Sequence, residues 1–252
     1  MSAASEVFRA ALVTGGSSGI GRAVAGVLAG SGFDLTLVGR DPDRLGEAAS
    51  ALAATGRQVH TLVADLGQPD RAEEAVDAHV TRFGRLDCVV SNAGGGRRAE
   101  VADTDRRALR RLLAVHVESA FALARSALPL LRRPPGPDGR VGETTWFVAT
   151  ASVSGLAPTP GFAAYSAAKS ALVSLVGSMN AEESIHGVRA CALCPGFVDT
   201  PMTAPLGGAI DAPGMIRPED VAASMSFLLS LSSNAIVGEL VIQRAGTRPF
   251  EP

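Results

Sequence analysis

The sequence predicts an α/β fold: a doubly wound, seven-stranded parallel sheet between two layers of helices. Two observations predict it. Seven short apolar runs alternate with segments of helical periodicity along the 252 residues. The runs are apolar throughout rather than alternating with polar residues, and strands of that kind are buried on both faces of a parallel sheet. A three-layer αβα arrangement follows.

The expected strands are short, as strands of a buried parallel sheet usually are. They cover residues 11–15, 35–39, 60–65, 87–92, 145–150, 188–194 and 239–243. Proline at the first helical position lacks an N–H that would be unpaired there anyway, so it predicts helices beginning at Pro42 (after an Asp41 cap), Pro69 and Pro218. Other helices are expected from Ile20 and over 104–131 and 162–186. The Pro/Gly-rich segment 132–143 predicts a surface loop.

Nothing in the composition divides the chain, so residues 1–252 are expected to form a single domain that carries every site. The net charge is −2 and no dense basic block recurs along one face, which argues against nucleic-acid binding. No apolar run reaches the about 18–20 residues of a membrane span, and the first residues do not resemble a signal peptide. A cytoplasmic protein with no membrane partner is expected.

The three cysteines predict neither a disulfide framework nor a metal site. Cys191 and Cys194 form a C-x-x-C, but it lies in an expected buried strand, where an offset of three points the two side chains to opposite faces. Redox C-x-x-C pairs stand at helix N-termini instead. Plain core cysteines are therefore expected.

A glycine-rich turn, TGGSSGIG (14–21), follows the first expected strand and opens a helix. Gly15, Gly19 and Gly21 allow a sharp turn, close approach to a pyrophosphate and tight packing of helix on strand. The helix N-terminus offers free N–H groups and partial positive charge to phosphates. Although the spacing is not G-x-G-x-x-G, its placement predicts a dinucleotide site.

The end of the second expected strand bears on which dinucleotide binds. An acidic residue there would bond the ribose 2′-hydroxyl of NAD(H), but the chain has Gly39-Arg40 instead, with Asp41 following. A guanidinium suits the 2′-phosphate, so the sequence favours NADP(H) over NAD(H). Arg40 stacked on the adenine, compatible with either cofactor, is the alternative.

The only tyrosine and the only lysine of the chain, Tyr165 and Lys169, stand four positions apart on an expected helix. Side chains at this spacing lie on one face, where a phenol beside an ammonium forms an acid/base pair. The alternative is a surface tyrosine with a solvated lysine nearby.

TGGSSGIG, SNAG (91–94), Ser152, YSAAK (165–169) and PGFVDTPM (195–202) together resemble the short-chain dehydrogenase/reductase superfamily in its single-domain form, across nearly the whole chain and in the family's order. The resemblance implies a Rossmann-type fold and catalysis by Ser152, Tyr165 and Lys169. Tyr165 would donate a proton, or accept one in oxidation, with its pKa lowered by the ammonium and the oxidised nicotinamide. Ser152 would bond the carbonyl oxygen, and Lys169 the nicotinamide ribose. The implied cofactor contacts, beside Tyr165 and Lys169, are Gly15, Ser17, Ser18, Gly19, Ile20, Gly21, Arg40, Asp65, Leu66, Asn92, Ala93, Gly94, Pro195, Gly196, Val198 and Thr200.

The sequence departs from the family at two places. His116 stands where the family commonly has an asparagine that completes a proton relay to the lysine. Either His116 substitutes in that relay or it makes structural bonds only. A catalytic His116 would make His116→Asn shift the pH–rate profile. QRAG (243–246) replaces an acidic residue and two glycines, which leaves the C-terminal packing and subunit contacts open.

The expected function is an NADP(H)-dependent oxidoreductase that interconverts a ketone or aldehyde and an alcohol. The small-molecule substrate is expected to be largely apolar, because the expected lid, 201–216, is rich in Gly, Pro, Ala and Met. Arg97 and Arg98 are candidates to meet an anionic group, with surface solvation as the alternative. Family resemblance implies a homotetramer or homodimer through the helices from Thr104 and Phe162. The rival hypothesis is a dinucleotide-binding regulatory or scaffold protein that has lost catalysis.

Overall fold

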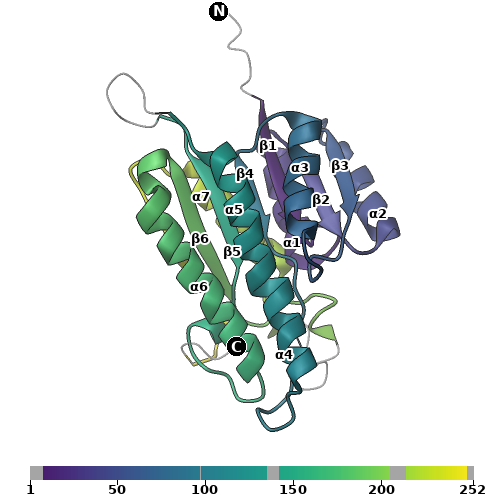
Figure 1. Ribbon diagram of the computed structural model, residues 1–252, viewed down its shortest axis with the longest axis vertical. Coiled ribbons are helices and arrows are strands. Elements are labelled where there is room, and N and C mark those ends of the chain that lie inside the picture. The colour runs from purple at the N-terminus through teal and green to yellow at the C-terminus, as the bar shows by residue number, and fades with distance from the viewer. Residues whose placement is uncertain (1–7, 97, 135–141, 205–213, 249–252) are drawn as a thin grey trace, which may run out of the picture.

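The computed structural model describes residues 8–96, 98–134, 142–204 and 214–248. Within these residues, seven strands form one sheet in the order β3-β2-β1-β4-β5-β6-β7 (Figure 1). Every neighbouring pair is parallel. The sheet expected from the apolar runs is therefore confirmed.

The strands follow the apolar runs closely, and no end differs from the expected one by more than two residues. Their bounds are β1 (Arg9–Thr14), β2 (Phe33–Gly39), β3 (Val59–Val63), β4 (Cys88–Ser91), β5 (Thr145–Thr150), β6 (Val188–Pro195) and β7 (Glu239–Ile242).

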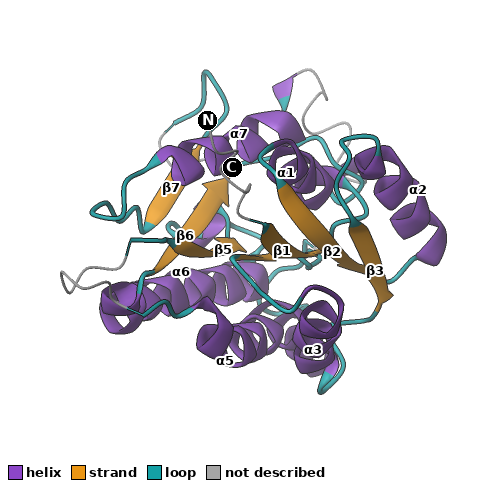
Figure 2. Ribbon diagram, turned by 90° about the horizontal axis from the view of Figure 1, so that it is seen from above, coloured by secondary structure: helices purple, strands orange, loops and turns teal. Residues whose placement is uncertain are grey.

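Helices cover both faces of the sheet. Figure 2 shows α1, α2 and α7 on one face and α3, α5 and α6 on the other, which completes the three layers. The helices are α1 (Gly19–Gly30), α2 (Pro42–Ala53), α3 (Arg71–Phe83), α4 (Arg106–Leu113), α5 (Ser119–Leu131), α6 (Ala163–Glu183) and α7 (Pro218–Ser230).

Two helices differ from expectation. The helix expected from Pro69 begins at Arg71, because Asp70 has a left-handed backbone with φ 63° and cannot belong to a right-handed helix. The single helix expected over 104–131 is α4 and α5 joined by a π-helical turn, residues 114–118, that contains His116. The predicted cap of α2 is confirmed: Asp41 accepts hydrogen bonds from the backbone N–H groups of Asp43 and Arg44.

The core has two apolar layers, one on each face of the sheet. Cys191 lies in one layer and Cys194 in the other, so the two thiols diverge, as expected for a strand. All three thiols are buried and free, and burial raises the pKa of Cys191 and Cys194 to about 12. They are core side chains.

The order of the strands places a crevice at one edge of the sheet. β1 pairs with β2 on one side and with β4 on the other, so the chain reverses its direction of travel across the sheet between β3 and β4. Ligands of open α/β sheets bind outside the carboxyl ends of the strands at such a switch point. No helix among the described residues is long and apolar enough to cross a membrane.

Candidate active site

The turn between β1 and α1 is built for an anion. Gly15 and Gly19 have positive φ, 64° and 51°, which glycine adopts without strain. A Cβ on Gly19 would lie 2.9 Å from Thr200 Cγ2, so this surface leaves no room for a side chain. Ser18, the N-cap residue before α1, makes no capping hydrogen bond through its side chain, and the first turn has no acidic residue. The free N–H groups and the positive end of the helix thus remain available to phosphates.

Gly21 has a packing role that differs from the other two glycines. A Cβ at this position would lie 2.2 Å from Gly15 O and 2.5 Å from Asn92 Nδ2. Gly21 is not among the residues that line the cavity above it. It lets α1 pack against the ends of β1 and β4, which fixes the turn from below.

One cavity of about 1020 Å³ lies over the carboxyl edge of the sheet. Apart from Gly21, every residue expected to act in catalysis or cofactor binding lines it, although these residues are distributed over the chain from Gly15 to Thr200. These lining residues are Gly15, Ser17, Ser18, Gly19, Ile20, Arg40, Asp65, Leu66, Asn92, Ala93, Gly94, His116, Ser152, Tyr165, Lys169, Pro195, Gly196, Val198 and Thr200. Of the expected lid, residues 205–213 lie outside the described part of the chain.

Asn92 ties together the strands beneath this cavity. Its Nδ2 donates to Thr14 O at 3.1 Å, and its Oδ1 accepts from Thr150 Oγ1 at 3.0 Å. Thr14 Oγ1 also accepts from the backbone N–H of Asn92 and Ala93, at 2.9 and 3.0 Å. The ends of β1, β4 and β5 are therefore held in register. The sequence analysis missed Thr14 and Thr150, although a threonine at the last position of each strand was the available signal.

Arg40, at the end of β2, lines the cavity with an uncompensated charge. It is exposed, and no carboxylate among the described residues pairs with it. The adjacent Asp41 is engaged elsewhere, in capping α2 and in an ion pair with Arg44 at 3.3 Å. Asp65, two residues after β3, accepts a hydrogen bond from Gly67 N at 3.1 Å.

Ser152, Tyr165 and Lys169 come together at the wall of the cavity. Ser152 follows β5 and begins a short 3-10 turn, where its Oγ accepts from Ser154 N at 3.2 Å. Tyr165 and Lys169 stand in the first two turns of α6. Lys169 Nζ donates to Thr150 O at 2.6 Å and lies 5.4 Å from the centroid of the Tyr165 ring. The predicted pair thus shares one helix face, next to the predicted serine.

Burial sets the protonation of this trio. Burial raises the pKa of Tyr165 to about 12, and hydrogen bonding to Ser152 opposes this rise only partly. In the protein alone, desolvation of a phenolate outweighs what the neighbouring protein groups supply. The lowering expected from the sequence relies on the charge of the oxidised nicotinamide as well as on Lys169. Burial lowers the pKa of Lys169 to about 7. At neutral pH the phenol carries its proton, the form that a proton donor needs.

His116 lies behind Tyr165, buried in the π-helical turn. Its Nε2 is 2.7 Å from Gly95 O, and its Nδ1 is buried with no partner. The ring is fitted against Gly94, where a Cβ would lie 2.2 Å from His116 Cε1. Burial, with the Lys169 charge as a smaller cause, lowers the pKa of His116 to about 3, so the ring is neutral at physiological pH.

Apolar side chains surround the end of the cavity where Tyr165 lies. Phe162 meets Tyr165 and Phe197 edge to face, with centroid distances of 6.2 and 6.5 Å. Both phenylalanines and Met202 line the cavity. The sequence analysis did not single out these phenylalanines, because only the fold brings the segment before α6 next to the segment after β6.

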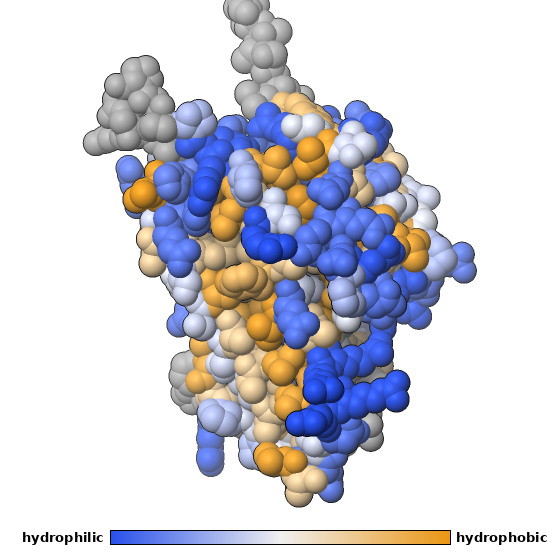
Figure 3. Space-filling model, viewed as in Figure 1, coloured by the Kyte–Doolittle hydropathy of each residue, from blue (hydrophilic) through white to orange (hydrophobic). Residues whose placement is uncertain are grey.

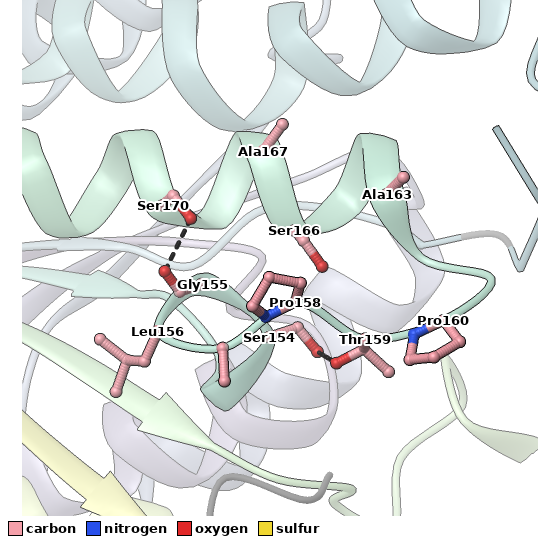
Figure 4. Close-up of a pocket in the computed structure, with 11 residues that line it drawn as sticks. Ser154, Gly155, Leu156, Pro158, Thr159, Pro160, Ala163, Ser166, Ala167 and Ser170 are labelled. Carbon is pink, nitrogen blue, oxygen red and sulfur yellow. Dashed lines mark hydrogen bonds between the residues drawn. The ribbon is translucent and has the colours of Figure 1, made fainter.

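A second cavity, of about 560 Å³, is lined by the loop that follows Ser152 and by the first turns of α6 (Figure 4). Ser154 and Thr159 bond to each other across the loop, and Ser170 Oγ donates to Gly155 O at 2.7 Å. No ionisable side chain lines it. The acid/base chemistry of the site therefore belongs to the larger cavity. Within the described residues, no cluster of His, Cys, Asp and Glu suits a metal ion.

Comparison with known proteins places this geometry in a family. The sequence model described as short chain dehydrogenase matches residues 9–210. A relative, 1-deoxy-11-beta-hydroxypentalenate dehydrogenase of Streptomyces exfoliatus, is 35% identical over 221 residues, which cover 85% of this chain and 77% of the relative.

Solved structures agree. An alcohol dehydrogenase from the archaeon Thermococcus sibiricus, complexed with 5-hydroxy-NADP, superposes with a TM-score of 0.84 at 28% identity, over 96% of this chain and 99% of that one. A short chain dehydrogenase from Burkholderia cenocepacia in complex with NADP gives a TM-score of 0.82 at 28% identity, over 94% and 96% of the two chains. The chain therefore belongs to the short chain dehydrogenase family, a family of oxidoreductases.

Proposed function

We propose that the protein interconverts a ketone or aldehyde and the corresponding alcohol with NADP(H), using Tyr165 as general acid and base. The observation that carries the proposal is the arrangement of Ser152, Tyr165 and Lys169 on the wall of a cavity that also contains the phosphate-binding turn. Two structural neighbours bear NADP or a derivative of it, which supports this cofactor.

The residues present fit a dinucleotide. The uncapped start of α1 and the glycine surface at Gly15 and Gly19 suit the pyrophosphate. Asp65, Asn92, Val198 and Thr200 all line the cavity. Asp65 and Asn92 would contact the adenosine, and Val198 and Thr200 the nicotinamide. When bound, the cofactor supplies the hydride that carbonyl reduction requires.

The preference for NADP(H) rests on Arg40. Its guanidinium has no carboxylate partner among the described residues and lies at the cavity, whereas Asp41 is occupied by α2 and Arg44. An anionic 2′-phosphate would supply the missing partner. We expect Arg40→Asp to raise KM for NADPH by about 10-fold or more, since hydrogen bonds to charged groups contribute about 1.5–3 kcal/mol. KM for NADH should change little.

Each member of the trio has a separate task in reduction. Tyr165 is protonated at neutral pH and donates that proton to the carbonyl oxygen. Ser152 Oγ hydrogen-bonds the same oxygen and stabilises the charge that develops on it. Lys169 is fixed by Thr150 O, 5.4 Å from the centre of the phenol ring, and in its protonated form it stabilises the tyrosinate left after transfer. In oxidation the roles reverse, and Tyr165 accepts the proton from the alcohol.

His116 is a positioning residue in this proposal. A histidine with a pKa near 3 is not protonated at neutral pH, and its Nε2 is already bonded to Gly95 O. These two facts favour structural bonds over a part in proton relay. His116 holds the segment after β4 and packs against the Tyr165 ring.

The remaining expectations concern partners and location. We propose a cytoplasmic enzyme that forms a homodimer or homotetramer through α5 and α6. Figure 3 shows apolar side chains gathered along the face where these helices lie. Phe121, on α5, is 60% exposed, and an interface formed through this helix would cover it.

The test is turnover by the purified protein. With NADPH and a panel of ketones and aldehydes, the absorbance of the reduced nicotinamide should fall for at least one carbonyl class. NADPH binding without turnover across a broad panel would instead support the rival, a scaffold protein of the same fold that has lost catalysis.

A further inference from the structure

Arg98 lies at the Tyr165 end of the cavity and has no role in the chemistry described above. It lines the cavity together with Gly96 and Phe162. Gly96 lies close to Tyr165, because a Cβ on this glycine would be 3.4 Å from two ring carbons of the tyrosine. Arg98 is therefore a cation at the substrate end of the site.

The backbone fixes the place of Arg98. Ala99 N donates to Gly161 O at 2.8 Å, which joins the segment after β4 to the turn before α6. The Arg98 side chain lies over Gly161: a Cβ on that glycine would be 3.0 Å from Arg98 Nε and 3.2 Å from Cγ. Gly161 has φ 76°, a conformation that favours glycine, so the turn leaves space for the arginine.

The charge of Arg98 is not compensated within the described part of the chain. Of the arginines that line the cavity, Arg44 pairs with Asp41 at 3.3 Å and Arg111 with Asp65 at 3.7 Å. No described carboxylate lies within 4.0 Å of Arg98. Arg40 is the other cavity arginine in this state, and the proposed function assigns it a phosphate. Arg98 has no such assignment.

We propose that Arg98 is a specificity-determining residue that binds an anionic group of the substrate, a carboxylate, sulfonate or phosphate ester. A guanidinium presents parallel N–H groups that match such groups in two-pronged hydrogen bonds. Phe162, Phe197 and Met202 would contact the carbon skeleton between that group and the carbonyl. The substrate is then apolar in its body, as the sequence suggests, but anionic at one end. This inference rests on the proposed function.

The experiment compares oxo acids with their methyl esters. Levulinate, acetoacetate and 5-oxohexanoate, each beside its ester, vary the distance from carbonyl to anion. For the best spacing, the wild-type enzyme should show a higher kcat/KM for the acid, and Arg98→Gln should lower the acid-to-ester ratio by about 10-fold or more. Arg98→Lys should keep part of the ratio, and Arg98→Glu should lower it further. Added salt should weaken the preference.

Arg106→Gln is the matched control. Arg106 begins α4, is exposed and does not line the cavity, so this variant changes the net charge equally but leaves the site intact. The ratio should be that of the wild type. An equal ratio in wild type and Arg98→Gln, or an equal fall in both variants, would overturn the assignment.

The outcome for the proposed function is separate, because the ester reports carbonyl reduction without an anion. If neither acid nor ester turns over, the reaction class is in question, and calorimetry decides on Arg98. Levulinate binding to the enzyme with NADP⁺ that Arg98→Gln weakens would support the anion site. No binding of any of the three acids would overturn it.

Discussion

The ring of His116 meets the ring of Tyr165 edge-on, with centroids 5.7 Å apart and an interplanar angle of 87°. Edge-to-face contact is a favoured arrangement of two rings. His116 Nε2 hydrogen-bonds to Gly95 O, and the absence of a side chain on Gly94 leaves room for the imidazole ring. The ring of Tyr165, the proposed proton donor, therefore packs against a neutral aromatic ring.

Replacing His116 separates a positioning role from a titrating one. Because its pKa is near 3, His116→Asn should leave the pH–rate profile above pH 5 unchanged while retaining activity. His116→Ala removes both the Gly95 bond and the ring contact, so kcat should fall by up to about 100-fold through misplacement of the phenol. Steady-state rates from pH 5 to 10 check both variants. A pH–rate profile of His116→Asn that is shifted along the pH axis would instead support the relay hypothesis.

Gly94→Ala should be destabilising where Gly95→Ala is not. A Cβ at Gly94 would lie 2.2 Å from His116 Cε1, whereas nothing lies within 4 Å of a Cβ at Gly95. We expect the free energy of unfolding to fall by about 1–3 kcal/mol in Gly94→Ala. In a His116→Ala background most of that loss should disappear, which urea unfolding of the four proteins of this double-mutant cycle measures. Equal losses in both backgrounds would refute the steric account.

Lys169→Met should stabilise the protein while abolishing catalysis. The pKa of Lys169 is about 7 in the folded state, below its ordinary 10.5. Keeping the lysine charged in the folded protein at neutral pH therefore lowers the free energy of unfolding. The linkage makes this penalty complete below pH 7, smaller as pH rises, and absent above about 10.5. Removing the amine should therefore raise the free energy of unfolding by about 1–3 kcal/mol at pH 7. Unfolding curves at pH 7 and pH 10.5 check this: the gain should vanish at the higher pH.

Acid should destabilise the fold through two buried histidines. His79 is bonded to Thr36 Oγ1 and Arg85 O, and burial lowers its pKa to about 4, as it lowers that of His116 to about 3. Both take up a proton on unfolding as pH falls below 6.5. Stability present above pH 6.5 should then be lost towards pH 4, at up to about 1.4 kcal/mol per pH unit for each histidine. Urea titrations between pH 7 and 5 measure the slope, which His79→Gln should reduce by about half.

The fold could be predicted from local signals, because each strand coincides with an apolar run and α1, α2 and α7 begin at a glycine or a proline. The exceptions have local causes that the sequence hides. The helix expected from Pro69 begins two residues later, at Arg71, because the backbone of Asp70 is left-handed. The π-helical turn at 114–118 interrupts a segment whose periodicity reads as one helix.

The site was predictable to the extent that its residues lie in fixed motifs. Tyr165 and Lys169 lie four residues apart on one helix, which puts them on the same face. Ser152 follows a strand that ends next to that helix. The places of Phe162 and Arg98 were not predictable in this way, because they depend on how the turn before α6 meets the segment after β4. The direction of the Tyr165 pKa also required the fold, since it depends on burial rather than on neighbours in the sequence.

The proton donor is the centre of the proposed function, and Tyr165→Phe tests it most directly. Without the hydroxyl, the ring still packs against His116 and Phe162, so the fold and NADPH binding should persist. With a ketone that the wild-type enzyme reduces, kcat/KM should fall by about 10²–10⁴-fold, the usual contribution of a positioned acid. A Phe variant that binds NADPH and reduces the same ketone at the wild-type rate would contradict the assignment.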